Sequence, residues 1–163
     1  YKIIYDTTTL PINPHSGNWA AWLGGLNDED SYIMQEVLVA NGSTQLSFYG
    51  WLQSHEDLCE YDFTYVDIAD KTYIMEHCEA TETHSWEHFL IPIEEFAGQQ
   101  ISIRFRTVTD TSNFSNFFLD DVSFVDTLVE PLSGPIQLQL ATSDHTPSEH
   151  PKTGQIVLEE QKR

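Results

Sequence analysis

The sequence predicts an all-β protein, an antiparallel β-sandwich of the jelly-roll type. Three observations support this fold class: apolar and polar residues alternate with period two, turn-forming residues recur about every eight to twelve positions, and no window has the period of a helix. Short strands separated by regular turns are typical of antiparallel sandwiches. The 163 residues are enough for one domain that buries its own core.

The strand pattern covers most of the chain before residue 126. Its clearest segment is residues 100–108. There Ile101, Ile103 and Phe105 share one face, and polar side chains take the other. Pro92 marks an edge strand or the end of a strand. The expected strands are residues 31–39, 45–52, 63–68, 72–76, 87–93, 100–108 and 117–125.

The regular pattern of strands and turns ends after Asp126. Prolines and a glycine punctuate a linker, residues 136–140 alternate like a short strand, and residues 155–158 form a final apolar run. We therefore expect a sandwich over residues 1–126. We expect a C-terminal extension over residues 127–163, whose two strand-capable segments could pair with another copy of the chain as exchanged or donor strands.

Six short motifs follow one another in order between residues 13 and 125. They are residues 15–25, 31–35, 46–51, 59–62, 97–99 and 115–124. The series resembles a family of secreted bacterial jelly-roll modules, similar to carbohydrate-binding modules and to MAM-like domains. The resemblance implies a galactose-binding-like sandwich, often with a structural Ca²⁺, that binds rather than catalyses. That family usually has a further edge strand ahead of the first motif, for which residues 1–5 are only a loose substitute.

Charge narrows the possible partners. The chain carries 26 acidic against 7 basic side chains, a formal charge of −19. Such a surface repels nucleic acids and anionic membranes and attracts cations, among which Ca²⁺ prefers carboxylate ligands. No stretch reaches the ~20 apolar residues that a membrane span needs. Tyr1 stands in place of an initiator Met, which fits a processed, exported product, so we expect an extracellular or cell-surface location.

Asp120 is the leading candidate for a metal ligand. With strict alternation, Phe118, Asp120 and Val122 share a face whose apolar members indicate the core. A carboxylate on that face needs a metal or another partner, because a buried unpaired charge is costly. The alternative is an aspartate at a strand end that caps a loop. The resemblance points to the same aspartate for Ca²⁺, with the backbone near Asn18 as a co-ligand.

A second acidic group contains Asp57, Glu60 and Asp62, with Asp110 as a further member from the loop before the last strand. It lacks the spacing of an EF-hand, so a solvated acidic loop and a metal site both remain open. As candidate ligands we take Asp57, Asp62 and Asp110.

Two cysteines, Cys59 and Cys78, lie in polar, acidic surroundings without zinc-ligand spacing. The alternatives are two buried free thiols or a disulfide between strand ends. We favour the disulfide, which fits an oxidising compartment.

The tryptophans are candidates for stacking against sugar rings. Trp22 and Trp51 lie in dense strand patterns, which favours the core. Trp19 and Trp86 lie nearer to loops, and we take these two as candidate ligand contacts.

Catalysis finds little support, because metalloprotease, nucleophile-elbow and phosphate-loop motifs are absent from the sequence. We expect a non-catalytic protein. The main hypothesis is an extracellular structural or adhesive subunit that assembles into a homo-oligomer or filament by strand exchange and is stabilised by calcium. The alternative is a carbohydrate-binding or other ligand-binding module of a larger secreted protein.

Overall fold

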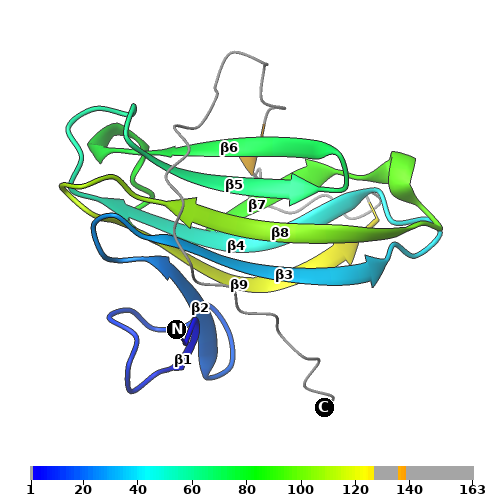
Figure 1. Cartoon of the computed structure of the whole chain (residues 1–163). Coiled ribbons are helices and arrows are strands. Elements are labelled where there is room, and N and C mark those ends of the chain that lie inside the picture. Colours follow the sequence, from blue (N-terminus) through cyan, green and yellow to red (C-terminus); the bar gives the residue numbers. More distant parts are fainter. Residues whose placement is uncertain (1, 127–135, 139–163) are drawn as a thin grey trace.

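Two β-sheets stack face to face in the computed structural model, which describes residues 2–126 and 136–138 (Figure 1). The strands are β1 (Ile4–Asp6), β2 (Trp19–Gly24), β3 (Asp30–Leu38), β4 (Gln45–Ser54), β5 (Asp62–Ile68), β6 (Lys71–His77), β7 (Glu87–Pro92), β8 (Gln100–Val108), β9 (Ser115–Val125) and β10 (Ile136–Gln137). The six-stranded sheet has the order β1-β2-β9-β4-β7-β10, and the four-stranded sheet has the order β3-β8-β5-β6. The predicted all-β sandwich is confirmed.

Alternation in β8 places its apolar side chains as expected. Ile101, Ile103 and Phe105 are buried between the sheets. The strand pairs antiparallel with β3 on one side and with β5 on the other. Two of its arginines form ion pairs on the outer face, Arg104 with Asp67 and Arg106 with Asp30, each with a shortest N–O distance of 2.7 Å.

The main core lies between the two sheets and is rich in aromatic side chains. Phe48 is fully buried at its centre. Its ring stacks against Phe89 at 5.2 Å and meets Phe105 edge-on at 5.0 Å between centroids. Both geometries are favourable for aromatic pairs and add to the stabilisation from apolar burial.

A second apolar cluster lies on the opposite face of the six-stranded sheet. Leu10, Ala20 and Phe118 are buried there, and Trp22 and Trp51 pack against them. Because Leu10 belongs to the segment between β1 and β2, this segment covers the sheet from outside. The six-stranded sheet is thus buried on both faces at this end, which explains the adjacent phenylalanines in β9.

The face assigned to Asp120 was wrong. Phe117 and Leu119 point into the main core, whereas Phe118 lies in the second cluster. Asp120 therefore lies on the face away from the main core, where it is half-buried. Strict alternation fails further along, because the β4–β9 register shifts between Ser47 and Tyr49.

The C-terminal extension is described only at residues 136–138. Ile136 and Gln137 pair parallel with β7 of the same chain, and Leu138 packs against the main core. The second strand-capable segment, residues 155–158, lies outside the described residues.

The predicted disulfide between Cys59 and Cys78 is confirmed, and it ties the β4–β5 loop to the end of β6. Two short 3-10 helices, η1 (Glu79–Thr81) and η2 (Glu94–Phe96), flank β7. None of the helices in the described part of the chain has the length and apolarity to cross a membrane.

Candidate functional site

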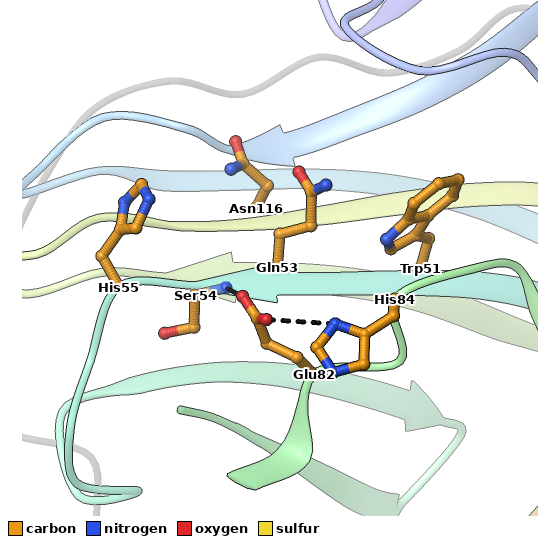
Figure 2. A pocket seen from close by; sticks show the side chains of 7 residues that line it. All are labelled: Trp51, Gln53, Ser54, His55, Glu82, His84 and Asn116. Atoms are coloured by element: carbon orange, nitrogen blue, oxygen red, sulfur yellow. Dashed lines mark hydrogen bonds and ion pairs between the residues drawn. The ribbon is translucent and has the colours of Figure 1, made fainter. Parts of the chain in front are cut away.

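A hollow of about 270 Å³ opens on the outer face of the six-stranded sheet, at the end of β4 (Figure 2). Its lining residues are Trp51, Gln53, Ser54, His55, Glu82, His84 and Asn116. Figure 2 shows Trp51 at one end and His55 at the other, with two amide side chains between them. The hollow thus combines one flat aromatic surface with several groups that can donate or accept hydrogen bonds.

Strand alternation builds the floor of this hollow. In β4, Leu52 points into the main core, so Trp51 and Gln53 point outward. Gln53 lies directly opposite Asn116 of β9, which places the two amides side by side. These side chains stand on paired central strands, so their spacing is set by the sheet.

Loop residues complete the wall below β4. Glu82 Oε1 accepts a hydrogen bond from the backbone N–H of Ser54 at 2.7 Å. Its other oxygen lies 3.4 Å from His84 Nδ1. His84 has a positive φ of 56°, which turns the chain sharply between Glu82 and β7. One carboxylate therefore joins the loop before β7 to the floor of the hollow.

The tryptophans lie only in part as the sequence suggested: Trp22 packs against the second apolar cluster, as expected of a core residue. Trp51, which we assigned to the core, packs against the second apolar cluster and also lines the hollow, and its buried Nε1 finds no hydrogen-bond partner among the described residues. Trp86 packs edge-on against Trp51 with 6.1 Å between ring centroids and donates its Nε1–H to Asn13 O, but it is not among the residues that line the hollow. Trp19 is exposed, but it is not among the residues that line the hollow.

Three carboxylates meet next to the hollow. Ligand oxygens of Glu56, Asp62 and Asp110 all lie within 4.8 Å of one another, so this group could hold a metal ion. Burial raises the pKa of the Glu56 carboxyl, with the charges of Asp62 and Asp110 adding to the effect, and burial also raises the pKa of Asp62. Of the predicted ligands, Asp62 and Asp110 are brought together, whereas Asp57 is exposed and lies outside the group.

Glu56 was missed, although it directly precedes Asp57. Its backbone N–H donates to Ser54 Oγ at 3.0 Å, which turns the chain inward after β4 and buries Glu56 instead of its neighbour. A serine two positions before an acidic residue is too common a pattern to predict this turn.

The carboxylates of Asp120 and Asp121 hold the loop before β2. Asp120 Oδ2 accepts from the Ser16 N–H at 3.1 Å, and Asp121 accepts from Ser16 Oγ and from His15 Nδ1 at 2.5 and 2.7 Å. Burial raises the pKa of Asp120. Asn18 O accepts from the Thr7 N–H at 3.1 Å, close to the same loop. A metal role for Asp120 and Asn18 stays a prediction.

A second, apolar cavity of about 200 Å³ opens along the side of the sandwich between β3 and β9. Its lining residues are Ile33, Met34, Gln35, Val37, Leu46, Ile103, Phe105, Leu119, Val122, Ser123 and Phe124. Strand β2 pairs with β9 only from Asn116 to Leu119. Within the described residues, the rest of β9 on this side, and the facing edge of β3, have no strand partner.

No family model matches the chain, and no curated protein matches it in sequence. Among solved structures, the chain is similar to TmCBM61 in complex with β-1,4-galactotriose, with a TM-score of 0.50 and 17% identity over 76% of this chain and 80% of that one. It is also similar to a family 16 carbohydrate-binding module, with a TM-score of 0.42 and 16% identity over 70% and 81%. The chain is thus a jelly-roll domain with the fold of carbohydrate-binding modules, as the motif series implied.

Proposed function

We propose that this chain is a non-catalytic, extracellular carbohydrate-binding module. The observation that carries the proposal is the hollow of Figure 2, where Trp51 adjoins the paired amides of Gln53 and Asn116. Sugar rings present an apolar face and a rim of hydroxyl groups, and binding sites of this kind combine an apolar surface with a few placed polar groups. The likeness to carbohydrate-binding modules supports the same function.

The ligand we propose is a neutral oligosaccharide. Glu82 places a carboxylate in the wall, and the chain as a whole carries a formal charge of −19. Both disfavour uronic or sialic acids, because like charges repel across the site. Since the similar TmCBM61 structure contains β-1,4-galactotriose, that trisaccharide is the first glycan to try.

The test is a titration calorimetry measurement with β-1,4-galactotriose, preceded by a neutral-glycan array. We expect saturable binding, and Gln53→Ala should weaken it about five-fold, because one hydrogen bond of about 1 kcal/mol is lost. Gln100→Ala, an exposed glutamine on the other sheet, is the matched control. If the chain binds no glycan of the array, or if wild type and Gln53→Ala bind with equal affinity, the hollow is rejected as the glycan site.

The ion we propose for the carboxylate group is a structural Ca²⁺. The donors at Glu56, Asp62 and Asp110 are all carboxylate oxygens, which are the ligands that Ca²⁺ prefers. Two of these oxygens, Glu56 Oε1 and Asp62 Oδ2, are buried without a hydrogen-bond partner among the described residues, so the site fits a cation. Bound there, the ion would neutralise charge that burial otherwise makes costly.

Assembly by strand exchange is a second candidate, favoured by the apolar cavity between β3 and β9. The backbone edges beside it, which no strand of the described residues pairs, could accept a strand from another copy, whose alternate side chains would enter the cavity. Light scattering of the full chain at high concentration should then show oligomers that vanish when residues 139–163 are removed, a deletion that leaves β10 in place. A monomer under both conditions would reject this candidate.

A further inference from the structure

The carboxylate group at Glu56, Asp62 and Asp110 joins the two sheets at one end of the sandwich. Glu56 follows β4 of the six-stranded sheet, Asp62 begins β5 and Asp110 follows β8, both of the four-stranded sheet. With their oxygens within 4.8 Å, three negative charges repel one another across this junction. A cation bound among them would instead draw the three segments together.

Two oxygens of the group lack a hydrogen-bond partner in the described part of the chain. Glu56 is 3% and Asp62 0% exposed, yet Glu56 Oε1 and Asp62 Oδ2 have no hydrogen-bond partner among the described residues. All lysine and arginine side chains of the described region are engaged elsewhere. They are Lys2 with Tyr5 and Trp19, Lys71 with Glu95, Arg104 with Asp67, and Arg106 with Asp30. A cation bound to Glu56 Oε1 and Asp62 Oδ2 would supply the positive charge that these described side chains do not.

A short chain of hydrogen bonds connects this group to the hollow. Glu56 N–H donates to Ser54 Oγ at 3.0 Å, and Ser54 Oγ lies 2.8 Å from Ser115 Oγ in the buried space between β4 and β9. The backbone N–H of the same Ser54 donates to Glu82 in the wall of the hollow at 2.7 Å. Ser54 therefore shares contacts with the carboxylate group and with the hollow.

Neighbouring residues bring the two sites closer still. His55 stands between Ser54 and Glu56 in the chain and forms one end of the hollow. Asn116, which supplies an amide to the floor, directly follows Ser115. A backbone shift of Glu56 away from its acidic neighbours would move His55, because the two share a peptide bond.

We infer that Ca²⁺ bound by Glu56, Asp62 and Asp110 fixes the His55 end of the hollow, so that glycan binding depends on calcium although the ion does not touch the sugar. This inference rests on the proposed function of the hollow. Without the ion, repulsion drives Glu56 outward and His55 follows. The Cys59–Cys78 disulfide limits the movement to the few residues between β4 and Cys59.

The experiment uses the full chain, freed of metal with EDTA and dialysed. Calcium is titrated by calorimetry, and the side-chain NH₂ resonances of Gln53 and Asn116 are followed by ¹H–¹⁵N NMR. We expect Ca²⁺ to bind, to raise the melting temperature and to shift both amide resonances. Affinity for β-1,4-galactotriose should rise at least ten-fold between EDTA and calcium buffers.

The variant Glu56→Gln removes one ligand charge with little change of shape. It should abolish calcium binding, the amide shifts and the calcium dependence of glycan affinity together. Asp57→Asn is the matched control, since it makes the same chemical change at an exposed neighbour outside the carboxylate group, and it should behave like wild type.

Each way of failing has its own signature. A chain that does not bind Ca²⁺ overturns the inference at once. If Ca²⁺ binds but the amide resonances and the glycan affinity do not change, the coupling is wrong and the glycan site stands. If Ca²⁺ shifts the amides but no trisaccharide binds in either buffer, the proposed function fails for this glycan, and calcium-dependent binding of it fails too.

Discussion

The indole Nε1–H of Trp22 donates a 2.9 Å hydrogen bond to Oδ1 of Asn116. The bond joins the second apolar cluster to the hollow, since Trp22 packs against Phe118 beneath the N-terminal segment and Asn116 forms part of the floor. Because the amide oxygen is taken by Trp22, the amide NH₂ group is the part left for a ligand. Trp22, which belongs to an apolar cluster, thus determines that Asn116 offers a hydrogen-bond donor to a ligand in the hollow.

Removing this bond should weaken glycan binding more than it weakens the fold. Trp22→Phe keeps an aromatic ring against Phe118 but frees the Asn116 amide to rotate. We expect the free energy of unfolding in urea to fall by about 1 kcal/mol and the affinity for galactotriose to fall several-fold in calorimetry. Trp19→Phe, at an exposed tryptophan outside the hollow, is the control. If Trp22→Phe binds galactotriose with the affinity of wild type, the orientation of the Asn116 amide does not matter for binding.

A close approach between β2 and β9 should make Gly24 irreplaceable. Its φ is +71°, and a Cβ there would lie 2.4 Å from the carbonyl oxygen of Ser115. Gly42 also has a positive φ, +93°, but a Cβ there meets nothing within 4 Å. Gly42→Ala should therefore lose only about 1–2 kcal/mol for its left-handed backbone, as measured by urea unfolding. Gly24→Ala should lose more or fail to fold, and equal losses would contradict the close approach.

The disulfide should contribute about 3 kcal/mol to stability, because it closes a loop of moderate length in the unfolded chain. The double variant Cys59→Ser, Cys78→Ala tests this, with alanine at the second position because Cys78 is 1% exposed and a serine hydroxyl would be buried there. Its urea midpoint is compared with that of the oxidised wild type. Wild type treated with a reductant should have the same urea midpoint as the variant. If oxidised wild type and the variant unfold at the same urea concentration, the disulfide does not contribute to stability.

Acid should destabilise the protein through His77. Its side chain is fully buried, with Nε2 2.8 Å from Thr64 Oγ1, and burial lowers its pKa from 6.5 to about 3. Between these values the unfolded chain binds a proton that the folded chain does not, so stability is full above pH 6.5 and falls as the pH drops toward 3. The loss from this group approaches about 1.4 kcal/mol per pH unit.

Urea unfolding at several pH values between 7 and about 4.5 measures that slope. In His77→Gln, the free energy of unfolding should fall less steeply with decreasing pH than in wild type, because the unfolded variant takes up one proton fewer. His84→Gln, at a side chain that is 77% exposed, should run parallel to wild type. Parallel curves for His77→Gln and wild type would show that another group is responsible.

Most of the strands could be predicted from the sequence, because one face of each is buried and the other is not. Strand β2 was missed for the opposite reason: Leu23 enters the main core while Ala20 enters the second cluster, so its apolar residues do not alternate. The same two-sided burial led to the wrong face for Asp120. No local signal indicates that residues before β2 fold back over the sheet.

The candidate sites were harder to predict than the strands. The disulfide and two members of the carboxylate group, Asp62 and Asp110, could be named from acidic and polar context. The hollow could not, since it combines side chains of β4, β9 and the loop before β7 that are brought together only by strand order. Trp51 was assigned to the core, and it does pack against the second apolar cluster, but the same outer face of the sheet also carries the hollow.

Strand order also determines when this protein can fold. In the six-stranded sheet, β2 and β4 are both neighbours of β9 and not of each other, although β9 follows both of them in the chain with four other strands between β4 and β9. When β1 to β8 have left the ribosome, the six-stranded sheet therefore exists only as two fragments, β1-β2 and β4-β7, with no ladder between them. Domains usually fold as units during synthesis, and here the unit is incomplete until β9 emerges. The six-stranded sheet of the nascent domain is therefore completed across its middle only when β9 emerges.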